Sequence, residues 1–109
     1  MAKATYWQRG ETLDYTNSTS AVIEANTIIA LSGRIGVAGT SINPGEKGDV
    51  HVTGVYEIAK TGNAAIKQGQ SVYWDGEGIT DAADSNTLAG YAAQDAEAND
   101  STILVKLQG

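Results

Sequence analysis

The sequence predicts an all-β fold, a small single-domain β-sandwich or barrel of short strands with at most one short helical turn. Residues 49–60 alternate between apolar and mixed positions with a period of two, which is typical of a strand. The 13 glycines are spread along the 109 residues as turn signals between short segments. The only stretch of helical composition, residues 92–98, is too short and too polar for a core helix. A chain of this length forms one domain, residues 1–109.

The clearest predicted strand is residues 49–60, with Gly54 in the middle of its apolar face. This glycine indicates a bulge or a close approach of another chain segment. We expect the apolar face to be buried against the strands over residues 71–74 and 102–107. That face comprises Val50, Val52, Tyr56 and Ile58, and the last strand has a matching face of Ile103, Val105 and Leu107.

The other strands are shorter and are separated by turn residues. The apolar run 27–31 is typical of a strand buried on both faces. Ser32-Gly33 predicts a hairpin to the next strand, Asp75-Gly76-Glu77-Gly78 predicts a tight turn, and residues 63–67 could form a helical turn. These further strands are predicted over residues 4–9, 12–16, 27–31, 34–38, 71–74, 79–80, 88–93 and 102–107.

Composition excludes several classes of protein. The net charge of −6 argues against a nucleic-acid partner, because phosphate binding needs a basic surface. Without cysteine there is no disulfide, thiolate nucleophile or cysteine metal site. The longest apolar run, residues 28–31, is too short to cross a membrane, and no signal peptide is recognisable at the start. We expect a soluble protein that is made in a cytoplasm.

The residues with catalytic potential are scattered, so we expect no catalytic site, no cofactor and no metal. His51 is the only histidine, and we expect it on a solvated strand face. Turn chemistry accounts for Asp75. Asp81 and Asp84 lack the glycine and the distal glutamate of a calcium loop. No phosphate-binding glycine loop precedes a helix.

The aromatic residues have a structural and a binding interpretation. A core without phenylalanine needs Tyr56 and one of Tyr73 and Trp74 as large fillers. Tyr6 and Trp7 are neighbours, so in a strand their side chains would point to opposite faces, and one ring would be exposed unless a partner covered it.

The whole chain resembles the phage capsid decoration proteins, also called capsid cement proteins. The most specific element is Val72-Tyr73-Trp74-Asp75, and Tyr91 stands where the family usually has an aliphatic residue. The other matching segments are residues 8–15, 34–38, 45–48, 50–60, 66–71, 90–92 and 102–107, in family order. Members have sometimes been labelled as putative phage recombinases. This sequence speaks against that label, because it lacks a phosphate loop, a basic face and the length of an ATPase domain.

The resemblance implies a structural virion protein rather than an enzyme. Such a protein binds the outer surface of a bacteriophage head and stabilises the lattice of the major capsid protein, as a homotrimer at three-fold positions. Within this chain, residues 2–9 are a candidate contact strand or arm. The candidate contact residues for the capsid or a neighbouring subunit are Lys3, Tyr6, Trp7 and Arg9.

Three alternatives remain open on the sequence. Residues 4–9 could be the first strand of the sandwich, with both rings packed inside. The domain could be a carbohydrate-binding β-sandwich, which would need an exposed Trp7 or Trp74. It could also be a small hydrolase built around His51, which would need a carboxylate within hydrogen-bond reach of the imidazole.

Overall fold

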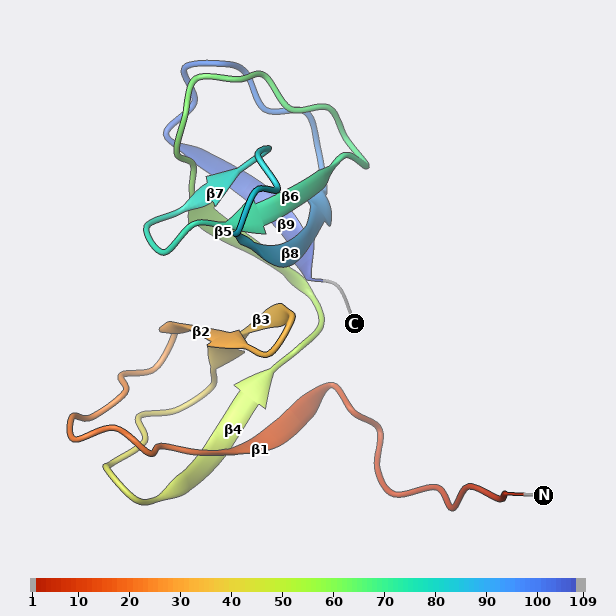
Figure 1. Ribbon diagram of the computed structural model, residues 1–109, viewed down its shortest axis with the longest axis vertical. Coiled ribbons are helices and arrows are strands. Elements are labelled where there is room, and N and C mark those ends of the chain that lie inside the picture. Colours follow the sequence, from red (N-terminus) through yellow and green to blue (C-terminus); the bar gives the residue numbers. More distant parts are fainter. Residues whose placement is uncertain (1, 108–109) are drawn as a thin grey trace.

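The computed structural model describes residues 2–107, and these residues form nine strands and no helix. The suggested helical turn at residues 63–67 is wrong, because Ile66 instead forms a β-bridge with Ala96. Within the described residues no helix is present that could cross a membrane. The strands are β1 (Thr12–Thr16), β2 (Ile28–Leu31), β3 (Arg34–Ala38), β4 (Lys47–His51), β5 (Val55–Ala59), β6 (Ser71–Trp74), β7 (Ile79–Thr80), β8 (Thr87–Ala92) and β9 (Thr102–Leu107) (Figure 1).

The strands form two antiparallel sheets. One has the order β1-β4-β3-β2 and the other the order β5-β9-β8-β6-β7. The sheets lie at opposite ends of the molecule, and the chain passes from the first to the second between β4 and β5 (Figure 1). They pack together through β3 and β8. Neither sheet closes on itself, so the architecture is an open β-sandwich and not a barrel.

The predicted strand over residues 49–60 is in fact two strands, one in each sheet. The chain changes sheet at residues 52–54, where Gly54 has a φ of 111°, a conformation that residues with a side chain rarely adopt. The Gly54 carbonyl accepts a hydrogen bond from the Leu107 N–H (2.9 Å), which ties the crossing to β9. Val50, Val52 and Ile58 are buried as expected, since the alternation keeps its phase across the bend. The expected packing against residues 71–74 and 102–107 holds for Ile58 but is wrong for Val50 and Val52, which pack within the first sheet because the chain changes sheet after them.

Two apolar clusters form the core, and β3 contributes to both. Ile35 and Val37 belong to the larger cluster, between the sheets, and Ala38 to the smaller one. Gly36 lies so close to a Val50 methyl group that a side chain could not fit there. The expectation that residues 27–31 form a doubly buried strand is therefore wrong: β2 is an edge strand, and β3 has that environment. The smaller cluster comprises Ile29, Ala38, Val50 and Val52, and the larger cluster includes Ile58, Val72, Ile103, Val105 and Leu107.

The same short turn occurs four times among the described residues, twice in each half of the chain. Each turn directly follows a residue that forms an isolated antiparallel bridge. These bridges join Ile23 to Ile42 and Ile66 to Ala96. Each turn is closed by a backbone hydrogen bond across three residues, and a strand follows. The third residue after each bridge residue is Asn26, Gly45, Gly69 or Asn99. The body therefore consists of two halves built on one plan.

Candidate functional site

Residues 2–10 form an exposed arm, without a strand, ahead of β1 (Figure 1). The predicted strand over residues 4–9 is wrong, because no neighbouring strand pairs with this segment. Tyr6 is 80% exposed and Trp7 is 88% exposed, so neither ring packs inside the sandwich. The alternative that both rings belong to the core is excluded as well. The segment instead presents two large aromatic side chains to solvent.

The arm and the body have opposite charge. Lys3 and Arg9 are the only side chains in residues 2–10 that are charged at pH 7. The remaining residues contain five cationic and all 13 anionic side chains, a formal charge of 5 − 13 = −8. A cationic, aromatic segment thus projects from a strongly acidic body.

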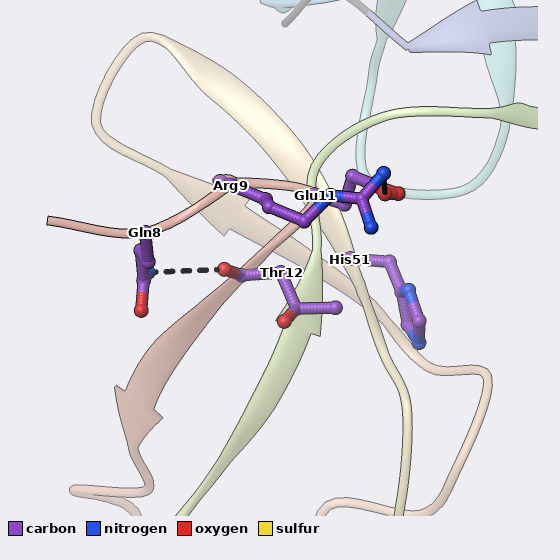
Figure 2. Close-up of a pocket in the computed structure, with 6 residues that line it drawn as sticks. Gln8, Arg9, Glu11, Thr12 and His51 are labelled. Atoms are coloured by element: carbon purple, nitrogen blue, oxygen red, sulfur yellow. Dashed lines mark hydrogen bonds and ion pairs between the residues drawn. The ribbon is translucent and has the colours of Figure 1, made fainter. Parts of the chain in front are cut away.

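The arm joins β1 beside an open concavity of about 490 Å³. Gln8 Nε2 donates a hydrogen bond to the Thr12 carbonyl (3.3 Å), and Arg9 forms an exposed ion pair with Glu11 (3.9 Å). Figure 2 shows the Arg9 and Glu11 side chains turned toward each other, while the His51 imidazole lies apart from them. The concavity is lined by Gln8, Arg9, Gly10, Glu11, Thr12 and His51.

His51 is held by packing and not by a carboxylate. Its ring is half-buried against Gly39, where an added Cβ would lie 2.7 Å from Nε2. Within residues 2–107 no carboxylate accepts a hydrogen bond from this imidazole, which is the partner that a hydrolase would need. In the same part of the chain no cluster of three or more acidic or histidine side chains could hold a metal ion.

Asp75 stabilises a turn, as its position in the sequence predicts. One carboxylate oxygen accepts hydrogen bonds from the N–H groups of Glu77 and Gly78 (both 2.9 Å), and the other accepts one from Thr61 Oγ1 (2.7 Å). These hydrogen bonds, that from Thr61 above all, lower the pKa of the Asp75 carboxyl below its ordinary value. Asp81 and Asp84 are exposed on a loop, consistent with the surface role expected for them.

Tyr56 and Trp74, two aromatic residues of the body, are structural. Tyr56 and Trp74 are half-buried and pack against the larger core cluster, as the lack of phenylalanine led us to expect. Trp74 is therefore not the exposed platform that a carbohydrate-binding module needs. Trp7 is exposed, but it lies on the arm and not among the residues that line the concavity.

Asn17 has a structural role that the sequence did not reveal. Its side chain is fully buried at the end of β1, where Nδ2 donates to the carbonyls of Ala21 (2.8 Å) and Ile42 (2.9 Å). Oδ1 accepts hydrogen bonds from the Thr19 N–H (2.9 Å) and Oγ1 (2.6 Å). One side chain therefore holds the loop after β1 against the turn that precedes β4.

A family model described as phage cement protein matches residues 7–107, so the match includes Trp7, Arg9 and every strand. No curated protein and no solved structure matches the chain. Since the family model covers nearly the whole of the 109 residues, the chain belongs to the phage cement protein family.

Proposed function

We propose that this protein binds the outer surface of a phage head and stabilises the lattice of the major capsid protein, as trimers at three-fold positions. The match to the phage cement family over residues 7–107 is the observation that carries the proposal. Membership of this family makes the protein a capsid component of the virion. The outer location, the trimer and the major capsid partner are the finer part of the proposal.

The exposed arm supports a binding role. Exposed aromatic side chains beside cationic ones are typical of residues that dominate binding energy at interfaces. In addition, the arm leads into β1, whose outer edge has no partner strand within residues 2–107. A free edge can pair with an extended segment of another protein. We assign contacts with the major capsid protein or a neighbouring subunit to Lys3, Tyr6, Trp7 and Arg9.

The body suits a protein that must stay dispersed before it assembles. Its formal charge of −8 makes free copies repel one another, and this repulsion opposes nonspecific association through the exposed aromatic rings. The absence of cysteine leaves no thiol to be oxidised in an extracellular particle.

Co-sedimentation with phage heads from which the cement protein has been removed tests this function. The full chain should pellet with the heads and should raise the temperature at which they release DNA. A chain lacking residues 2–7 should keep the circular dichroism spectrum of the folded protein but lose decoration. If the full chain does not bind stripped heads, the proposed function is wrong. If the shortened chain folds and decorates normally, the arm is not the contact segment.

A further inference from the structure

The outer face of β5, β9 and β8 carries apolar side chains that the fold leaves uncovered. Val55 and Tyr91 are 54% and 42% exposed. Both stand opposite Lys106 in the strand register, so Val55, Lys106 and Tyr91 form a row across the three strands. Glu57 pairs with Leu104 on the same face, two residues further along β5 and β9. These five residues are called the outer face below.

An acidic rim adjoins the outer face. Glu57, Asp95 and Asp100 line a shallow concavity of about 240 Å³, and Leu104 forms part of the same surface. The Lys106 ammonium donates hydrogen bonds to the Leu107 carbonyl (2.9 Å) and Thr53 Oγ1 (3.4 Å). These contacts hold its head group, and its aliphatic stem adds to the apolar row. The outer face therefore has a row of two apolar side chains on either side of Lys106, and it is negatively charged at one border.

We infer that the outer face receives the arm of a second copy of this chain. Tyr6 and Trp7 supply apolar surface that matches the row of Val55 and Tyr91. Lys3 and Arg9 supply the positive charge that the acidic rim lacks. Every copy carries both an arm and an outer face. The opposite charges of the arm and the acidic rim favour binding of arm to face over contacts between two arms or two bodies.

The arm and the outer face lie on different parts of the molecule. The arm leaves β1 beside the four-stranded sheet and runs outward from the body, whereas the outer face belongs to the five-stranded sheet (Figure 1). The contact thus joins two different surfaces, and such head-to-tail contacts form rings when the rotation closes. Extended over eight residues, the arm reaches at most about 26 Å from its base. This inference rests on the proposed function, because it explains how the copies in a trimer would hold one another.

Cysteine cross-linking tests the inference with little background, since the chain has no native cysteine. One full-length variant carries Thr5→Cys in the arm, which leaves Tyr6 and Trp7 intact. A second, marked by a mass tag, carries Val55→Cys on the outer face. The matched control carries Val22→Cys, which is also an exposed valine (50%) but lies in the loop between β1 and β2. Equimolar mixtures are treated with a short bismaleimide, and the tagged heterodimers are quantified.

We expect about fivefold or more heterodimer for Thr5→Cys with Val55→Cys than for Thr5→Cys with the control. Adding Trp7→Ser to the arm variant should reduce this yield to that of the control. Equal yields at the two valine positions, or a yield that does not respond to Trp7→Ser, would overturn the inference. Head binding is measured separately, so that normal decoration without preferential cross-linking refutes the arm contact alone. Failure of the unmodified chain to bind heads refutes the proposed function.

Discussion

Replacing Asn17 by alanine should destabilise the protein by about 1–3 kcal/mol. The substitution removes one buried hydrogen bond, to the Ile42 carbonyl, which then keeps only the hydrogen bond from the Ile23 N–H. Because this oxygen stays paired, the loss of one hydrogen bond to it costs about 0.5–1.5 kcal/mol. The bonds to Ala21 and Thr19 are partly accessible, so water replaces them in part and each adds less. The unfolding free energy lost on this substitution measures how strongly the Asn17 side chain holds the loop after β1.

Urea unfolding followed by tryptophan fluorescence provides the measurement, with the half-buried Trp74 as the reporter. Asn63→Ala is the matched control, because Asn63 is exposed, and it should change the unfolding free energy by less than about 0.5 kcal/mol. Asn17→Asp should destabilise the protein at least as much as alanine does, since a carboxylate would face two carbonyl oxygens. If Asn17→Ala unfolds like its control, the argument from buried hydrogen bonds is refuted.

Three further predictions concern the core, a turn and the histidine. Ile58→Ala should cost about 2–5 kcal/mol in urea unfolding, because it leaves a cavity beside Ile103 and Val105; a loss below 1 kcal/mol would contradict its burial. The lowered pKa of Asp75 stabilises the fold above about pH 4, and this contribution disappears as pH falls through the folded-state pKa. The difference in unfolding free energy between the wild type and Asp75→Asn should therefore shrink on acidification. A difference that stays constant with pH would contradict the claim that the ionised Asp75 carboxylate stabilises the fold. His51→Ala should leave unfolding and head binding within about 1 kcal/mol, and loss of head binding would reveal a role for His51.

Local signals in the sequence were sufficient to locate most strands. The hairpin across Ser32-Gly33 joins β2 to β3 as predicted, because a two-residue turn between two β-prone segments leaves the chain few other arrangements. The alternation in residues 102–107 identified the buried face of β9. Both signals depend on residues close together in the sequence.

The errors arose where the answer depended on a distant neighbour. Residues 4–9 have the composition of a strand, but composition cannot supply a partner strand, and this segment is an arm. The period of two over residues 49–60 continues through Gly54, so it does not show that the chain changes sheet there. The apolar run of β2 suggested a central strand, although its place at the sheet edge depends on how β3 and β4 pair.

The assignment of contacts to the arm stays a prediction. Lys3, Tyr6, Trp7 and Arg9 were selected from their types and their position ahead of the first turn, and all four are exposed. Their partner surface could not be predicted, because the outer face combines residues from β5, β8 and β9. The short turn that occurs four times was also missed from the sequence. Its copies share little beyond an apolar residue followed three positions later by glycine or asparagine.

The division of the chain into a paired body and an unpaired arm separates stability from binding. The contacts of the arm with the body are confined to its base, where Gln8 reaches the Thr12 carbonyl and Arg9 reaches Glu11, both on the surface. Neither contact contributes much to stability, because exposed hydrogen bonds and ion pairs are weak. Substitutions at Tyr6 and Trp7 should therefore change binding while leaving the unfolding free energy nearly constant. Substitutions at Asn17 or Ile58 should do the reverse, unless the destabilised body unfolds under the conditions of the binding assay.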